Sequence, residues 1–121
     1  MRTRPDVMSE EIIGGQVIRR DEAGYLVDPD DWSKDVAEHF AADEGIDLGD
    51  DHWTVLEFMR NYLAEHGIAA DARFTFRYLG EHHGESVKAA RRRFFILFPY
   101  GYTKQACKIA GMRQPRAWST G

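Results

Sequence analysis

The 121-residue sequence contains a single cysteine, Cys107, and no long apolar run. One cysteine excludes an internal disulfide, and its presence without a hydrophobic N-terminal signal core indicates a reducing cytoplasm. No apolar stretch approaches the roughly 20 residues that cross a bilayer, so we expect no membrane partner. Internal repeats and low-complexity tracts are also missing. These absences predict one small soluble domain in which Cys107 is the residue best suited to covalent chemistry.

Patterns typical of metal and phosphate sites are missing as well. A zinc site usually needs a second cysteine or an HExxH helix, and the sequence has neither. The adjacent His82 and His83 precede Gly84 and are typical of a solvated helix end, where protonation suits the helix dipole. Gly14-Gly15 lacks the lysine and the strand–loop–helix context of a phosphate-binding loop. We therefore expect no metal and no cofactor.

Charge is distributed unevenly, although the net formal charge is only −4. Residues 1–72 hold 18 acidic and six basic residues, whereas residues 73–121 hold two acidic and ten basic residues. Such an asymmetry is typical of a charged docking face or a nucleic-acid footprint. The alternative is that the two halves neutralise each other across the fold.

Three consecutive arginines, Arg91, Arg92 and Arg93, lie in the basic half. Three successive side chains on a helix cannot share one face, so at least one should pack its stem on apolar surface. A glycine turn at Gly84 between two helical stretches also resembles a helix-turn-helix. Charge clustering alone does not establish DNA binding, so that hypothesis stays open. The other basic residues considered for this face are Arg73, Arg77, Lys88, Lys104, Lys108, Arg113 and Arg116.

Short apolar runs separated by turn residues predict a β-hairpin near the N-terminus. Residues 12–19 carry β-branched side chains around Gly14-Gly15, and a turn-rich stretch at 21–24 separates them from the apolar run 25–27. The polar, aperiodic residues 1–11 are expected to be a disordered tail.

Five helical stretches follow, indicated by apolar spacing, acidic starts, and glycine or proline ends. Phe74, Tyr78 and Leu79 should face inward from the third stretch, and Val87, Ala90 and Phe94 from the fourth. The predicted ranges are 29 to about 44, 50–66, 70–81, 85–98 and 103–110.

Two roles for Cys107 follow from its neighbours. Lys104 and Lys108 flank it at i−3 and i+1, with Arg113 nearby, and positive charge lowers the pKa of a thiol. The same short helix also has an apolar side, which a cysteine can join as a small hydrophobe. No catalytic Cys–His–Asp signature surrounds the residue. Spacing alone leaves both roles open.

The segment around Cys107 closely resembles the C-terminal signature of the DsrC/TusE sulfur-relay family, also called the gamma subunit of dissimilatory sulfite reductase. It runs Leu-Phe-Pro-Tyr-Gly-Tyr-Thr-Lys-Gln-Ala-Cys-Lys-Ile-Ala-Gly over residues 97–111. The resemblance extends from about Ile12 to Pro115. Its upstream matches are residues 21–26 and 31–32 for the hairpin and first helix, and 52–53, 58–60 and 66–69 for the central helix and its turn.

This resemblance implies an α+β fold, with a β-hairpin or short meander packed on about five helices, in one domain over residues 12–121. It also implies a flexible C-terminal arm at 112–121. Family members carry sulfur as a cysteine persulfide or trisulfide between sulfurtransferases and sulfite reductase or tRNA thiolation machinery. Their main carrier is a cysteine near the end of the arm, where this sequence has Trp118. Cys107 matches a second cysteine eleven residues earlier, and Tyr102 replaces a family proline.

Two hypotheses of different class result. In the first, the chain is a carrier-like or accessory sulfur-relay protein, not a true sulfurtransferase, and Cys107 accepts sulfur beside Lys104 and Lys108. Its partners would be sulfurtransferases or sulfite-reductase-type proteins. In the second, the chain is a regulatory paralogue that binds DNA or relay proteins through its basic half. The binding residues predicted for this surface are Lys104, Lys108, Arg91, Arg92, Arg93 and Arg113.

Overall fold

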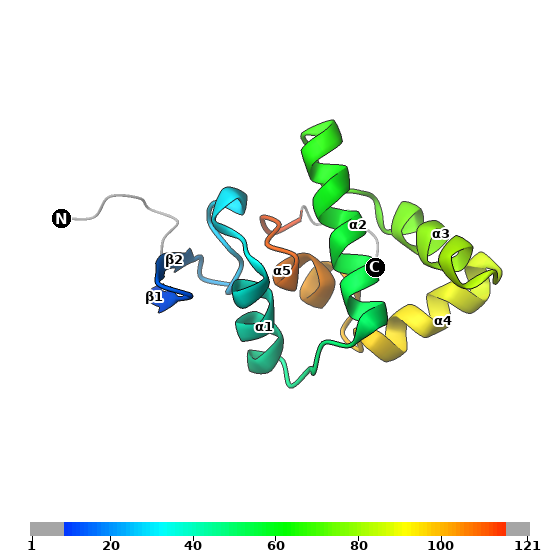
Figure 1. The fold of residues 1–121 in the computed structure, drawn as a ribbon, viewed down its shortest axis with the longest axis horizontal. Coiled ribbons are helices and arrows are strands. Elements are labelled where there is room, and N and C mark those ends of the chain that lie inside the picture. Colours follow the sequence, from blue (N-terminus) through cyan, green and yellow to red (C-terminus); the bar gives the residue numbers. More distant parts are fainter. Residues whose placement is uncertain (1–8, 116–121) are drawn as a thin grey trace.

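The computed structural model describes residues 9–115 and shows an α+β fold with one N-terminal hairpin and five α-helices. Figure 1 shows the hairpin at one end of the molecule and the pair α3–α4 at the other, with the short α5 between α1 and α2. No helix in the described range is long and apolar enough to cross a membrane. The elements are β1 (Ser9–Ile13), β2 (Gln16–Arg20), α1 (Lys34–Asp43), α2 (Asp50–His66), α3 (Ala72–His83), α4 (Val87–Leu97) and α5 (Cys107–Ile109).

The hairpin forms earlier in the chain than predicted. β1 and β2 pair antiparallel around Gly14-Gly15, and both glycines have the positive φ that a tight two-residue turn needs. The predicted turn at 21–24 is instead a loop after β2, which returns Leu26 to bridge Arg20. The predicted tail 1–11 was too long, because strand β1 already begins at Ser9. Residues 1–8 lie outside the described part of the chain.

Salt bridges explain why a polar segment forms the first strand. Glu10 bonds to Arg19, its direct partner across the hairpin, at 3.1 Å, and Glu11 bonds to Arg20 at 3.3 Å. Opposite charges at facing positions stabilise an antiparallel pair. Apolar runs alone do not predict this contribution, because it comes from charged pairs across the hairpin.

Serine and aspartate side chains set three helix starts. Ser33 caps α1 by accepting from the Val36 amide, and Asp71 and Ser86 cap α3 and α4 in the same way. The predicted start of the first helix at Pro29 forms a separate 3₁₀ turn, η1 (Pro29–Asp31). Since a capping side chain stops the helix from extending backward, α1 starts five residues later than expected.

The core confirms some inward residues and corrects others. Leu79, Ala90 and Phe94 are fully buried, as predicted. Phe74, Tyr78 and Val87 were wrongly assigned to the core, being 36%, 41% and 50% exposed. On α3 the buried stripe instead contains Phe76, whose ring lies 5.1 Å from that of Phe94 on α4. The reason is that α3 packs mainly against α4, so its other side is only partly covered by α2.

Candidate functional site

Cys107 begins α5, directly after a π-helical turn, η2 (Tyr102–Ala106). Its amide donates to the Tyr102 carbonyl, which closes the wider π turn. Such turns occur frequently at functional sites. The thiol is 1% exposed and joins the main hydrophobic core.

One buried side chain, Tyr25, and two partly buried ones, Trp32 and Arg60, hold this segment in place from distant parts of the chain. A helix as short as α5 leaves its carbonyl groups without intrahelical donors, so other groups must satisfy them. One of these side chains, Arg60, is itself held by two further contacts. Its guanidinium donates to the Pro29 carbonyl at 2.9 Å and lies 4.7 Å above the Trp32 ring. The donors to the segment are Tyr25 Oη to the Thr103 oxygen (2.8 Å), Trp32 Nε1 to Ile109 (2.9 Å) and Arg60 to Ala110 (3.1 Å).

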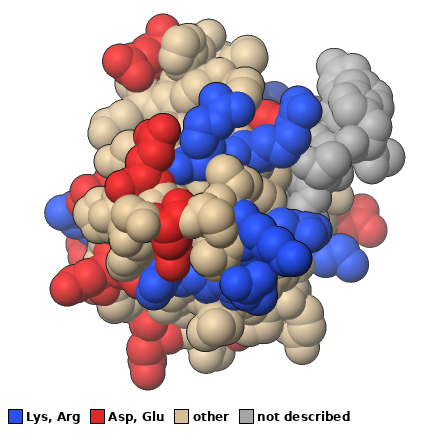
Figure 2. Space-filling model, turned by 90° about the vertical axis from the view of Figure 1, so that its right-hand side faces the viewer, with Lys and Arg blue, Asp and Glu red and all other residues tan. Residues whose placement is uncertain are grey.

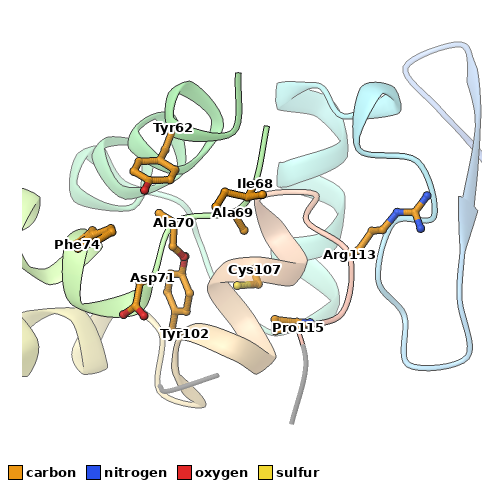
Figure 3. A pocket seen from close by; sticks show the side chains of 10 residues that line it. All are labelled: Tyr62, Ile68, Ala69, Ala70, Asp71, Phe74, Tyr102, Cys107, Arg113 and Pro115. Carbon is orange, nitrogen blue, oxygen red and sulfur yellow. The ribbon is translucent and has the colours of Figure 1, made fainter. Parts of the chain in front are cut away.

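A cavity of about 340 Å³ reaches Cys107 from the side of α2 and α3. Figure 3 shows the sulfur pointing toward Tyr102 and Ala70, and not toward Arg113, whose side chain extends away from the cavity. The lining is mostly apolar and aromatic, with one carboxylate. It comprises Tyr62, Ile68, Ala69, Ala70, Asp71, Phe74, Tyr102, Cys107, Arg113 and Pro115.

Burial keeps Cys107 protonated. It raises the pKa of the thiol to about 12, against which the contact with the Tyr102 hydroxyl acts only weakly. That hydroxyl donates its proton to the Ala70 carbonyl, and burial raises its own pKa. The Tyr102 hydroxyl also has side-chain hydrogen-bond contacts with Thr75 and Cys107. The resting site therefore contains a neutral thiol, not a thiolate.

The expectation that Lys104 and Lys108 lower the pKa of Cys107 is therefore wrong. The two lysines lie four residues apart, on the same side of the helical turn, and both border a second cavity near Tyr25 and Glu44. Lys108 Nζ lies 3.4 Å from Glu44 Oε2 and 5.3 Å from the Tyr25 ring centroid. Cys107 instead borders the first cavity, and the charges adjacent to it in sequence do not offset its desolvation.

The basic half of the chain is partly neutralised. Arg93 bonds to Glu85 at 2.8 Å and approaches Asp51 of the acidic half at 3.5 Å, while Arg91 lies 5.4 Å above the Phe95 ring. This confirms that one of the three arginines packs against apolar surface. Figure 2, which faces the α3–α4 end, still shows Lys and Arg side chains gathered in two groups. Some charges thus pair across the two halves, as one alternative predicted, and others lie on a basic surface.

Comparison with known proteins identifies the fold. A family model described as "DsrC like protein" matches residues 12–117. The chain belongs to the DsrC-like family. Sulfurtransferase TusE of Pectobacterium atrosepticum is 39% identical over 101 residues, which cover 84% of this chain and 92% of that protein. Sulfurtransferase TusE of Salmonella typhimurium is 38% identical over 104 residues, which cover 86% and 94%.

Solved DsrC structures agree with the assignment. The oxidized gamma subunit of the dissimilatory sulfite reductase (DsrC) from Archaeoglobus fulgidus superposes with a TM-score of 0.78 at 30% identity, covering 90% of this chain and 98% of that one. DsrC of Allochromatium vinosum superposes with a TM-score of 0.76 at 32% identity, covering 89% and 96%. These comparisons confirm the predicted family and the α+β architecture.

Sequence reasoning missed the residues that position Cys107. Tyr25, Trp32 and Arg60 were seen only as parts of matching motifs, although each donates to a carbonyl around the thiol or its helix. Their presence in the DsrC-like motifs was the available signal. Tyr102 was noted as a departure from the family, and the structure places it beside the sulfur. The predicted carrier position, Trp118, lies outside the described residues, as does the end of the predicted arm.

Proposed function

We propose that this chain is an accessory sulfur-relay protein that docks on sulfurtransferase or sulfite-reductase-type partners and holds Cys107 as a shielded sulfur acceptor. One observation carries the proposal: the single thiol of a DsrC-like scaffold is buried, yet it forms part of the wall of a cavity. The predicted cytoplasmic location is part of the proposal, because an acceptor thiol must stay reduced.

The transfer step needs no group beyond the thiol and a persulfide donor. The Cys107 sulfur attacks the outer sulfur of the donor R–S–SH, the donor S–S bond breaks, and a new S–S bond forms on Cys107. The products are R–SH and a Cys107 persulfide, with the thiol proton passing to the leaving sulfur. Because the resting thiol is neutral, it must first lose its proton, and we expect transfer to small donors to be slow.

Intact-mass measurement after incubation with a small persulfide donor tests this proposal. The expected result is a slow gain of one sulfur atom by the native protein and none by Cys107→Ser. Because a hydroxyl in an apolar site can destabilise the fold, Cys107→Ala serves as a second variant, with melting curves recorded for both. Cys107 would be rejected as the acceptor if the native protein gained no sulfur. It would also be rejected if Cys107→Ser and Cys107→Ala gained as much sulfur as the native protein.

The second hypothesis, DNA binding by a regulatory paralogue, is favoured by the basic surface over α3 and α4 (Figure 2). Two observations weigh against it: Arg93 is already paired with Glu85, and the relatives bear the names of sulfur-relay proteins. If DNA binds, a mobility shift should weaken steeply with salt, and Arg92→Gln should weaken it more than Arg93→Gln. No retardation at low salt rejects this hypothesis and leaves docking of relay proteins, which a pull-down would test.

A further inference from the structure

A second group of reactive side chains lies away from Cys107, where the start of α2 meets the end of α3. One ligand atom each from Asp51, His82 and His83 lies within 4.8 Å of the others. We call these three residues the histidine cluster. From the sequence alone His82 and His83 are predicted to be a solvated helix end, and no local pattern connects them with Asp51, which lies more than 30 positions earlier.

We propose that the histidine cluster binds a divalent transition metal ion of the zinc class. Two imidazole nitrogens and one carboxylate oxygen suit zinc, nickel or copper better than calcium or magnesium, which prefer all-oxygen sites. Three protein ligands leave a fourth tetrahedral position for water or an external ligand. The site is distinct from the proposed sulfur-relay chemistry, because it uses neither the thiol nor its cavity.

The backbone already holds the ligands close to one another. α3 ends at His83, and Gly84 at φ 65° turns the chain back so that both imidazoles stay near the helix end. His83 Nε2 lies 2.9 Å from Asp51 Oδ1, and the two histidine rings meet edge to face at 5.1 Å. The Asp51 and His83 side chains are only 27% and 24% exposed. These side chains therefore need to move little for an ion to take the place of the proton in the hydrogen bond between Asp51 and His83.

Arg93 is the positive charge that could oppose a metal ion here. Its guanidinium bonds to both Glu85 oxygens, at 2.8 and 3.3 Å, and reaches only Asp51 Oδ2, at 3.5 Å. Glu85 thus offsets Arg93, and Asp51 leaves the cluster with net negative charge when the imidazoles are neutral. Oδ1 of Asp51 remains available to a metal while Arg93 orients the carboxylate from behind, as outer partners of metal ligands commonly do.

Zinc titration against a chromophoric chelator tests the proposal. The protein should be untagged and carry Cys107→Ser, so that neither a tag nor the thiol competes for the ion. We expect one zinc per chain, with at least about tenfold weaker affinity in His82→Ala and Asp51→Asn, since each removes one of three ligands. His82 is exposed and its ring meets that of His83 edge to face, so His82→Ala should fold even if Asp51→Asn does not. His66→Ala, an exposed histidine outside the cluster, is the matched control and should bind zinc unchanged.

Two further measurements separate a built site from casual binding. Zinc should raise the melting temperature of the parent protein but not that of His82→Ala, because a ligand that binds only the folded state stabilises it. Cobalt should give a visible d–d spectrum without a thiolate charge-transfer band. Binding only at millimolar zinc, equal affinity in His82→Ala, or calcium binding as tight as zinc would overturn the proposal. None of these readouts involves sulfur transfer, so the two proposals fail independently.

Discussion

The Cys107 cavity and the histidine cluster gather reactive side chains in opposite ways. Cys107 lies among apolar groups, and its two neighbouring lysines face another surface. The histidine cluster draws its members from two helices and sits among charges that contact each other directly. The electrostatic environment of a reactive side chain therefore depends on the helix face it occupies and on how it is packed, not on which charges lie near it in the sequence.

The two sites also differ in how easily a ligand or reagent can reach them from solvent. The histidine cluster is partly open to solvent, so an ion can enter with little rearrangement. Cys107 is a neutral, buried thiol, and exposing it as a thiolate requires loss of packing or binding of a partner. A docking partner that opens the cavity would therefore control when sulfur reaches the thiol.

The largest expected effect concerns the reactivity of Cys107. A pKa raised from 9.0 to about 12 leaves about a thousandfold less thiolate at neutral pH than in the unfolded chain. We expect alkylation by iodoacetamide to be at least about a hundredfold slower in the native protein than in urea. The native rate should also rise steadily from pH 7 to about 11, whereas the rate in urea should reach half its maximum near pH 9 and level off above about pH 10.

The pH profile distinguishes a neutral thiol from a merely shielded one. Steric shielding of a thiolate would slow alkylation without moving the pH at which the rate levels off. A native rate within about tenfold of the unfolded rate would show that the thiol is not held neutral, and the contrast with the histidine cluster would disappear.

The second prediction concerns a substitution that disturbs the packing around Cys107 but leaves the histidine cluster intact. A Cβ at Gly111, which has φ +76°, would lie 2.4 Å from Cδ1 of Trp32, the indole that donates to Ile109. Gly111→Ala should therefore displace Trp32, cost more than about 3 kcal/mol of unfolding free energy in urea, and speed Cys107 alkylation. Zinc affinity at the histidine cluster should not change.

Gly45→Ala is the matched control for Gly111→Ala. Gly45 has nearly the same backbone angle, φ +73°, but no atom lies within 4 Å of its added Cβ. Only the left-handed conformation disfavours alanine there, at a cost of about 1 kcal/mol. Equal destabilisation by the two substitutions would mean that backbone strain, not the Trp32 contact, explains the effect.

The sequence predicted the architecture better than the site. Helix α2 and the buried Phe94 and Leu79 follow from apolar spacing and helix-end residues, which act locally. The side of α3 that packs on α4 could not be inferred, because both of its sides carry aromatic residues, and Phe74 was chosen over Phe76. That choice depends on which helix lies opposite, and such information is absent from a single segment.

The pKa of Cys107 and the residues that hold its segment could not be predicted, for the same reason. Cys107 was correctly singled out, but its pKa was assigned from sequence neighbours, whereas burial by distant segments determines it. Tyr25, Trp32 and Arg60 reach the thiol segment from 50 or more residues away. Recognition of the family motifs was the sequence signal that connected these positions to Cys107.

The smallest expected effect tests the discarded role of the lysines directly. Lys104→Gln and Lys108→Gln should each change the native Cys107 alkylation rate by less than about twofold, because both side chains lie on the Glu44 side of the turn. Lys108→Gln also removes the contact with Glu44, so its melting curve must be compared with that of Lys104→Gln. Lys88→Gln, on α4, serves as a surface control. A several-fold slower reaction in both variants without loss of stability would show that the lysines act on the thiol. Cys107 would then resemble the histidine cluster, with charges within reach tuning its reactivity.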